Sequence, residues 1–560
     1  MTYLLYLFIA LPCFWAANKI SWQVRTDAAS GMNPGEIFNH CLTDLTENPL
    51  HISGEPRDLI AGALVAMCVV MLLADRTARN RQRRRGEEHG SATWASRSDI
   101  RPYKNRTTAS NLLFTRTESL SLDSRTTQRN LNACIIGGSG SGKTRYYVMP
   151  NIHQANTSYV ITDPKGELYR ATSAYLEENG YQVRVLNLID FARSDQFNPM
   201  AYFNPNQAEV DCTILTENLV TNTSGKRPLS GGDFWEKAER ALLNALISYV
   251  YFTQTPTQPG TLIDVVNLLA DMQASEQDEE KQSKVDLIFD AVKDLLEEYD
   301  DYPPEKITSD ARTMLGGLRF AHSQYNTYLQ GAGETKKSVI ISLGVRMAPL
   351  HMAQIRHLLA QDTIRLDLLG KEKTALYLII PDTHATFNFL AAIFYEQLFE
   401  TNLYIADHND NGRLDVMVQC FMDEFANIGK LPSFERKIAV MRSRGISVSV
   451  IIQNFAQGKS LYKDDWETII GNCDSLLFLG GQEKSTTDYV SKMLGKQTII
   501  GTDTSLSKGR SGSFSRSDRL LGRELLTGDE VGRLPTDKCI YILRGVRPFL
   551  SRKLHAPTFS

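Results

Sequence analysis

The stretch of sequence that decides the fold is Ala133–Thr144, which reads Ala-Cys-Ile-Ile-Gly-Gly-Ser-Gly-Ser-Gly-Lys-Thr. An apolar run typical of a buried strand leads into a complete GxxxxGK[ST] motif, and a candidate helix over Thr144–Met149 follows. Glycines let the backbone turn so that successive N–H groups face phosphate oxygens, and the helix N-terminus adds positive potential. Because strand, loop and helix are all present, we predict a phosphate-binding loop rather than a chance glycine-rich turn. Its residues are Gly137, Gly138, Ser139, Gly140, Ser141, Gly142, Lys143 and Thr144.

The last two residues of this loop carry the side chains that a nucleoside triphosphate requires. Lys143 is expected to pair with the β and γ phosphates, and Thr144 is expected to offer its hydroxyl to Mg²⁺. The predicted cofactors are therefore ATP and Mg²⁺.

A nucleotide hydrolase also needs a carboxylate at the end of a neighbouring buried strand, and usually a base for water. The apolar run Val416–Asp423 ends in such a carboxylate, and Glu424 follows at once. We expect Asp423 to hold the metal together with Thr144, and Glu424 to polarise the attacking water. Alone, the acidic pair would more simply end a strand and cap the next helix. Beside a complete phosphate loop, the catalytic interpretation is favoured.

Four further polar side chains are weaker candidates. Gln453 closes the apolar run Ile446–Gln453, where an amide can sense hydrolysis, although an ordinary loop amide is an equal alternative. Arg442 and Arg444 come late in a helix, where compensation of the helix dipole is the simpler explanation. The sharper hypothesis is an arginine finger for a neighbouring subunit's ATP. Asp163 follows another buried strand, which suits a functional side chain or the first turn of a helix equally well.

From Leu131 onward, short apolar runs alternate with helical stretches, which predicts an α/β fold with a parallel sheet. Most runs are solidly apolar, as expected of strands covered on both faces. Three intervening helices end before Gly180, Gly445 and Gly495, the residue type preferred after a helix C-terminus. The predicted strands are Leu131–Gly137, Ser158–Thr162, Tyr181–Leu188, Thr374–Pro381, Val416–Asp423, Ile446–Gln453, Ser475–Gly480 and Cys539–Arg544.

Between about Glu209 and Tyr325 the periodicity is helical and no convincing strand is present, so we predict an all-α insertion at 209–325. The nucleotide-binding domain is then 129–208 together with 326–560. Within the insertion, Asp271–Lys306 carries 13 acidic and 4 basic residues. A solvated helix face is favoured there over a surface that docks a partner. The predicted helices are Phe234–Tyr251, Ile263–Met272 and Val285–Tyr299.

Two apolar runs open the chain, Thr2–Ala17 and Leu59–Ala74. The second spans about 24 Å as a helix, short of a hydrocarbon core of ~30 Å, so a soluble core helix is an alternative. Arginines follow it directly while the stretch between the runs is mostly acidic, and this asymmetry places both termini in the cytoplasm. A signal peptide is disfavoured because no basic residue precedes the first run. The prediction is a two-pass membrane anchor with helices at 1–17 and 59–75, an extracytoplasmic loop at 18–58, and a basic, polar linker at 76–128 with a docked segment around Trp94.

Composition narrows the function classes. The 560 residues include 61 basic and 64 acidic side chains, so any nucleic-acid contact must be a local patch or a ring built by several subunits. The eight cysteines are scattered without a CxxC pair, which leaves zinc and redox interpretations without support. Reduced, buried thiols suit a protein whose bulk is cytosolic.

The order of these motifs resembles the TraG-like coupling proteins of type IV secretion and conjugation. The resemblance implies a RecA-like P-loop NTPase domain with an all-α insertion, and six subunits in a ring on the inner membrane. It also implies single-stranded DNA with its relaxase, and the secretion channel, as partners. Carried over, Lys143 and Thr144 hold nucleotide and Mg²⁺, Asp423 and Glu424 drive hydrolysis, and Gln453 senses it. The matching segments, after the anchor and the phosphate loop, are Ile161–Leu168, Phe197–Pro199, Asp233–Trp235, Phe421–Phe425, Gly429–Pro432, Arg442–Gly445 and Gln453–Asn454.

Several functions fit this pattern to different degrees. The leading hypothesis is a motor in which ATP hydrolysis drives DNA or protein into the channel. A docking receptor that binds nucleotide without essential hydrolysis is the main alternative. A FtsK-like DNA pump is disfavoured because the end of the chain, Cys539–Ser560, leaves little room for a DNA-orienting module. A small-molecule kinase explains neither the anchor nor the insertion.

The acidic helical block favours a basic protein over DNA as the docked partner. The arginines near the C-terminus, for which a solvated loop is the favoured interpretation over a contact with DNA, are Arg510, Arg516, Arg519 and Arg523.

Overall fold

A computed structural model describes residues 2–47, 51–81, 86–223, 232–273, 282–506 and 514–555. The chain divides into two compact units. The larger unit contains residues 92–495 and 524–560, and the smaller unit contains residues 1–91 and 496–523.

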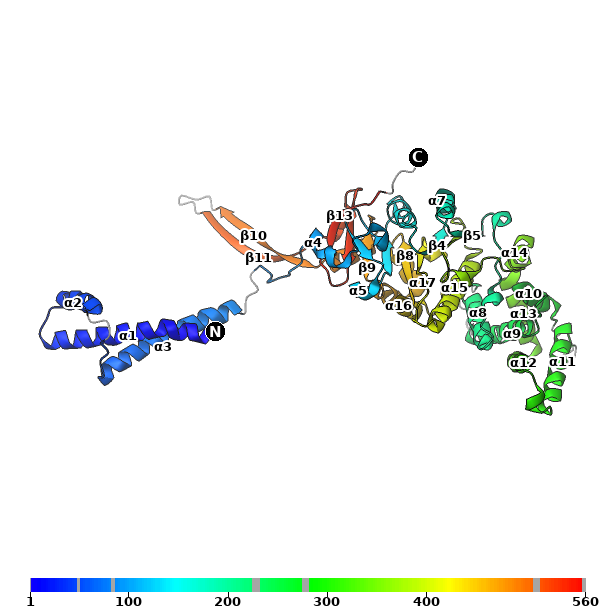
Figure 1. The fold of residues 1–560 in the computed structure, drawn as a ribbon, viewed down its shortest axis with the longest axis horizontal. Helices are drawn as coiled ribbons and strands as arrows, with labels where there is room; N and C mark the ends of the chain where they lie inside the picture. The colour runs from blue at the N-terminus through cyan, green and yellow to red at the C-terminus, as the bar shows by residue number, and fades with distance from the viewer. Residues whose placement is uncertain are drawn as a thin grey trace. The chain divides into compact units, whose positions relative to one another are not determined.

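In the described part of the larger unit, nine strands form one sheet in the order β13-β12-β9-β3-β8-β7-β4-β6-β5 (Figure 1). The seven strands from β9 to β5 run parallel, whereas β12 is antiparallel to both β9 and β13. All eight predicted strands are present, and the sequence missed only the short edge strand β13 of this sheet. The strands are β3 (Ala133–Ile136), β4 (Ser158–Asp163), β5 (Gln182–Asn187), β6 (Thr374–Ile379), β7 (Val418–Met422), β8 (Ile446–Ile452), β9 (Ser475–Phe478), β12 (Lys538–Leu543) and β13 (Phe549–Arg552).

Strand β3 lies inside the sheet, between β9 and β8, and both of its faces are buried. Cys134 and Ile136 pack into the core on one face, and Ala133 and Ile135 pack into the core on the other. This alternation is the period of two expected for a strand. The first core also contains side chains of α15 (Asn388–His408), α16 (Phe434–Arg444), α17 (Phe455–Tyr462), α18 (Asp465–Gly471) and α19 (Lys484–Leu494), and the second contains side chains of α6 (Met149–Ile152) and α7 (Glu167–Glu178).

A block of helices interrupts the sheet between β5 and β6, as predicted, but its predicted end at residue 325 needs correction. That boundary falls inside α12, and helices continue to Leu358 before β6 begins. The ring of Phe289 stacks on that of Tyr325 with their centroids 3.9 Å apart, which ties α11 to α12. The helices are α8 (Ala208–Thr223), α9 (Gly232–Phe252), α10 (Leu262–Asp271), α11 (Lys284–Asp300), α12 (Ser309–Leu329), α13 (Gly333–Met347) and α14 (Ala353–Leu358).

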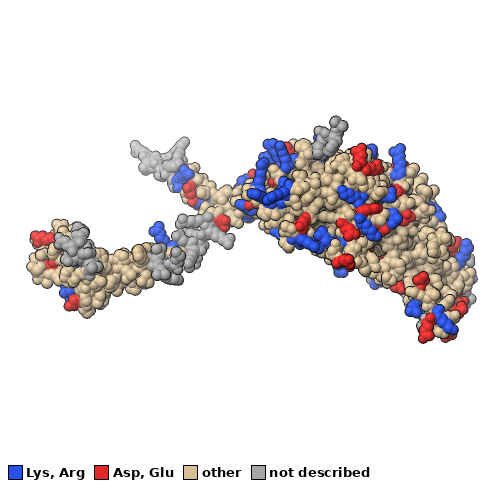
Figure 2. All heavy atoms as spheres, viewed as in Figure 1, with Lys and Arg blue, Asp and Glu red and all other residues tan. Residues whose placement is uncertain are grey.

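The acidic segment of this block is partly described. Asp290, Asp294 and Glu297 on α11 are exposed, as a solvated helix face requires, while residues 274–281 lie outside the described residues. Figure 2 shows acidic and basic side chains interspersed over this face of the larger unit, in keeping with the near-neutral balance of the chain.

The predicted linker 76–128 is a folded part of the larger unit from Ala92 onward, which corrects the prediction, although Trp94 does pack against the core as expected of a docked segment. Its segments are α4 (Arg97–Ile100), β1 (Asn111–Leu113), β2 (Ser119–Ser121) and α5 (Ser124–Thr127). The prediction failed because four apolar side chains embedded in polar sequence are enough to dock the segment. They join the core that contains Tyr541 and Phe549, and they are Ile100, Leu112, Phe114 and Leu120.

The smaller unit contains α1 (Thr2–Ala29), α2 (Pro34–Glu47) and α3 (Pro56–Arg81), with α1 packed against α3. Among the described residues, one segment is long and apolar enough to cross a membrane, Pro56–Thr77, and 11% of an 18-residue window within it is buried. This segment contains the predicted span 59–75. The predicted span 1–17 is instead the first part of a 28-residue helix that continues through polar residues to Ala29. The stretch predicted as a loop, 18–58, therefore contains the second part of α1, all of α2 and the start of α3.

The smaller unit also holds a two-stranded antiparallel ribbon, β10 (Lys496–Leu506) and β11 (Phe514–Glu524). The sequence placed this region in the nucleotide-binding domain as a solvated loop, and both predictions need correction. Arg516, Arg519 and Arg523 lie on β11, while Arg510 lies outside the described residues. Residues 516–523 are exposed along both faces of β11. The strand therefore has no buried face, and its sequence lacks the alternation of apolar and polar residues that predicts a half-buried strand.

Candidate nucleotide-binding site

The phosphate loop leaves the carboxyl end of β3 and is anchored to the strands on both sides. The Gly137 N–H donates to the carbonyl of Ile452 at 3.1 Å, and the Gly138 N–H donates to the carbonyl of Gly480 at 2.9 Å. Gly142 has a φ of +86°, and a Cβ there would lie 2.3 Å from the ring of Tyr146. A side chain at this position is therefore excluded by both conformation and space.

Two side chains of the loop point to where phosphate and metal are expected. Lys143 is 9% exposed, and its Nζ donates to the carbonyl of Gly137 at 3.0 Å. The hydroxyl of Thr144 donates to Oδ2 of Asp423 at 2.9 Å. The structure thus brings Lys143, Thr144 and Asp423 together, although 279 residues separate the last two along the chain.

These groups surround a cavity of about 180 Å³ at the carboxyl ends of the strands. The position is the one that open α/β sheets use for ligands. Lys143, Thr144, Asp423, Glu424 and Gln453, which the sequence assigned to phosphate, metal or water, all line the cavity, whereas Ser141 and the two arginines do not. The lining residues are Ser139, Gly140, Lys143, Thr144, Asp163, Pro164, Lys165, Glu167, Leu168, Asp423, Glu424 and Gln453.

The strand order corrects one detail of the prediction. The strand that ends at Asp423 was expected next to β3, but β8 lies between β3 and β7. Gln453, which directly follows β8, therefore sits between the loop and the carboxylates. Its Nε2 lies 3.4 Å from Oε1 of Glu424, so the amide and the proposed base are in contact.

Asp423 is 4% exposed, and burial raises the pKa of its carboxyl, while the hydrogen bond from Thr144 and the charge of Lys143 oppose that rise. A divalent cation would remove this penalty. Among the described residues no cluster of three His, Cys, Asp or Glu side chains is placed to hold a metal ion. The donors present, a hydroxyl and one carboxylate, fit Mg²⁺, which commonly takes its other oxygens from phosphate and water.

Glu424 has a backbone φ of +50°, a conformation that non-glycine residues rarely adopt outside constrained sites. Its N–H donates to Oδ1 of Asp423 at 3.0 Å. Asn427 holds the side chain by donating from Nδ2 to Oε2 at 2.8 Å. Asn427 was not predicted from the sequence, although its place three residues after Glu424 on a short helical turn is a usable signal.

Asp163 lines the cavity, but its carboxylate is occupied by the backbone. It accepts from the N–H groups of Glu167 at 3.0 Å and Tyr169 at 2.8 Å. Of the two interpretations of Asp163, the structure supports the one in which it caps the first turn of a helix.

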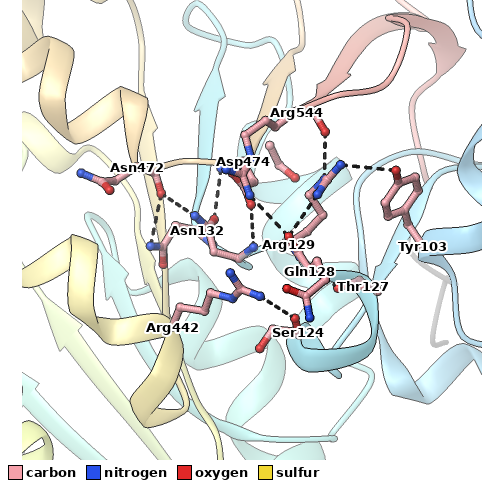
Figure 3. Close-up of polar contacts among 12 residues, drawn as sticks. Tyr103, Ser124, Thr127, Gln128, Arg129, Asn132, Arg442, Asn472, Asp474 and Arg544 are labelled. Atoms are coloured by element: carbon pink, nitrogen blue, oxygen red, sulfur yellow. Dashed lines mark hydrogen bonds and ion pairs between the residues drawn. The ribbon is translucent and has the colours of Figure 1, made fainter.

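Arg442 and Arg444 lie at the opposite end of the sheet, because α16 leads into the amino end of β8. Arg442 donates from Nη2 to the carbonyl of Ser124 at 2.8 Å (Figure 3). Arg444 pairs with Asp407 through Nε at 2.6 Å and Nη2 at 2.9 Å. The structure does not bring either arginine to the chain's own phosphate loop, so a role in hydrolysis requires another subunit.

The chain is similar in sequence to proteins of conjugative transfer. Residues 93–555 match the family described as "Type IV secretory system Conjugative DNA transfer". The conjugal transfer protein TraG of Escherichia coli is 25% identical over 418 residues, which cover 71% of this chain and 61% of TraG. The chain therefore spans about three fifths of that relative's length. VirD4 of Rhizobium rhizogenes is 22% identical and covers 98% of this chain and 77% of VirD4.

A solved structure shares the fold. The plasmid coupling protein TrwB in complex with ADP and Mg²⁺ aligns with a TM-score of 0.53 and 15% identity, covering 84% of this chain and 94% of TrwB. This likeness confirms the predicted α/β fold with its helices.

Proposed function

Because this chain belongs to the type IV secretory system conjugative DNA transfer family, we propose that it is a membrane-anchored ATPase that drives substrates into the secretion channel. The substrates would be single-stranded DNA with its relaxase, or proteins. Six copies would form a ring at the inner membrane. One observation carries the proposal: the Thr144 hydroxyl meets Asp423 beside Lys143 at the edge of a cavity that also holds Glu424.

In this proposal each side chain has a distinct role. Lys143 would bind the β and γ phosphates in place of the Gly137 carbonyl, and Thr144 and Asp423 would hold Mg²⁺, which would neutralise charge on the phosphates. Glu424, held by Asn427, orients the attacking water and accepts its proton. Gln453, which contacts Glu424, would report the loss of the γ-phosphate to β8. ADP and Mg²⁺ in the TrwB complex support the same choice of cofactors.

Membrane attachment is proposed through two passes, with α3 as the stronger of the two spans. The segment Pro56–Thr77 is apolar and largely exposed, which suits contact with lipid. Arg76, Arg79 and Arg81 at the end of α3 fit a cytoplasmic end for this helix. The larger unit then lies in the cytoplasm.

The test of the motor is Glu424→Gln in the full chain. This change keeps the shape of the side chain and removes the base, so ATP turnover should fall at least ~100-fold while ATP binding persists. Conjugative transfer should stop with it. Glu467→Gln, at an exposed position of α18 that does not line the cavity, is the matched control and should transfer normally. Transfer that survives the loss of turnover in Glu424→Gln would instead favour a docking receptor.

A further inference from the structure

The chain that follows β13 lies against the phosphate loop. Lys553 is 5% exposed, and its Nζ donates to the carbonyl of Ser141 at 2.9 Å. The same Nζ lies 5.4 Å from the ring centroid of Tyr146, within the range of a cation–π contact. Burial lowers the pKa of the Lys553 ammonium, while the nearby Cys539 and Asp537 oppose that shift. No local pattern in the sequence marks this lysine as part of the site.

Tyr146 is the centre of a small aromatic and cationic cluster beside the loop. Its ring covers Gly142, where only a hydrogen fits. The imidazole of His555 meets the ring edge-on with their centroids 4.9 Å apart, and the guanidinium carbon of Arg145 lies 5.7 Å from the ring centroid. Tyr146 is partly exposed, whereas Arg145 and His555 are exposed. The cluster is therefore accessible to a ligand seated in the loop.

The strand order indicates on which side of the loop a nucleoside would lie. Thr144 contacts Asp423 on the side of β3 that carries β8 and β7, so the metal and the terminal phosphate belong there. The other side of β3 carries β9, β12 and β13, and the chain that leaves β13 brings Lys553 and His555 to Tyr146. A nucleotide whose γ-phosphate lies toward β7 directs its base away from β7, toward this cluster.

We propose that Tyr146 and His555 form the base-binding surface for a purine nucleotide, and that Lys553 is a positioning residue that holds Ser141 of the phosphate loop. The proposal rests on the nucleotide-binding function proposed above. A purine offers a flat π-face, which stacks on tyrosine and histidine rings, and neighbouring cations strengthen such stacking. The surface is distinct from the catalytic residues, because Glu424 and Gln453 lie on the β7 side.

The test compares MgATP with Mg²⁺-tripolyphosphate, which has the phosphate chain but no base, by calorimetry on the full chain in detergent. In Tyr146→Ala, MgATP affinity should fall about tenfold while tripolyphosphate affinity is unchanged. Tyr146→Phe keeps the ring and should bind both as the wild type does. His555→Ala should lose a few-fold of MgATP affinity alone. Unchanged MgATP affinity in Tyr146→Ala, or an equal loss for both ligands, would overturn the base-binding role.

Substitution of Lys553 should change the two affinities in a different pattern, because Lys553 acts through the loop and not on the base. Lys553→Met should weaken MgATP and tripolyphosphate alike, by about threefold, and Lys553→Arg should restore both. A loss confined to MgATP, or no loss for either ligand, would contradict the positioning role. A wild-type chain that binds neither ligand would refute the proposed function itself, and this outcome differs from every failure of the base-binding surface.

Discussion

The two ends of the same sheet are both rich in polar side chains, yet they differ in what those side chains do. At the amino end, the groups satisfy one another: Asp474 accepts from the Asn130 N–H and from Nε of Arg544, each at 2.7 Å, while Arg129 donates to the Arg544 carbonyl at 2.9 Å (Figure 3). At the carboxyl end, the hydrogen bond that Lys143 makes within the described residues goes to a carbonyl of its own loop. Polar density alone therefore does not identify a site, whereas buried charge beside a cavity and a strained backbone does.

Asp423 is the residue at which the two ends of the sheet should differ most, and its substitution is expected to have the largest effect on turnover. Asp423→Asn keeps the shape of the side chain but removes the charge that would hold Mg²⁺. Turnover should fall about a thousandfold, since a metal contributes several kcal/mol of charge stabilisation and ~1.4 kcal/mol is tenfold in rate. Removing Mg²⁺ with EDTA should inactivate the wild type to the same level and leave the variant unaffected.

The matched control for Asp423 is Asp407→Asn at the other end of the sheet. Asp407 is about half exposed and pairs with Arg444, so removing its charge should leave turnover unchanged. Magnesium-dependent turnover in Asp423→Asn within tenfold of the wild type would contradict the assignment of Asp423 as the metal ligand.

At the amino end the expected effect is on stability and not on ligand binding. Asp474 is 4% exposed, and Asp474→Ala would leave the Asn130 N–H without its acceptor. The apparent stability should fall by about 2 kcal/mol, the usual cost of an unsatisfied buried donor. Thermal denaturation measures this loss, and calorimetry should show unchanged MgATP affinity. A weakened affinity at unchanged stability would reverse the roles assigned to the two ends.

The sequence predicted those features of the sheet and its carboxyl end that are formed by short, continuous segments. The glycines and Lys143 of the phosphate loop lie within eight residues, and each buried strand is a short apolar run. The pairing of strands is not local. The sequence located the runs that end at Asp423 and Gln453 but did not reveal that β8 lies between β3 and β7, because pairing depends on how distant segments pack.

Other features were missed because their role depends on contacts with segments that are distant in the sequence. Lys553 is an ordinary lysine in sequence, and only the return of the chain after β13 brings it to Ser141. Phe114 and Leu120 looked like isolated apolar residues in a polar linker, yet both are fully buried. Arg442 was a candidate for a finger acting on a neighbouring subunit, with compensation of the helix dipole as the simpler interpretation, and its position at the amino end of β8 separates it from the phosphate loop of its own chain.

A smaller effect is expected at Arg442, which joins the amino-end network through one hydrogen bond to Ser124. Arg442→Ala should lower the apparent stability by about 1 kcal/mol and leave the MgATP affinity of the isolated chain unchanged. Its proposed action on a neighbouring subunit is tested by measuring turnover against protein concentration. A loss of turnover confined to the assembled protein supports that action, and unchanged turnover there rules Arg442 out as the finger.

The smallest effect concerns the pH dependence that only the carboxyl end should show. Burial raises the pKa of Asp423 above its ordinary value of 3.8, so the folded protein without metal carries a penalty once the carboxyl ionises. Below 3.8 both the folded and the unfolded chain are protonated and the penalty is absent; it grows as the pH rises through the raised pKa. Asp423→Asn cannot ionise and escapes it. With EDTA present, the variant should therefore melt above the wild type at neutral pH, and the difference should shrink as the pH falls toward 3.8.

Added Mg²⁺ should reverse the order of the two melting temperatures, because it binds the ionised carboxylate of the wild type alone. A difference in melting temperature that does not change with pH would mean that Asp423 is held by its hydrogen bonds and not by a charge reserved for the metal.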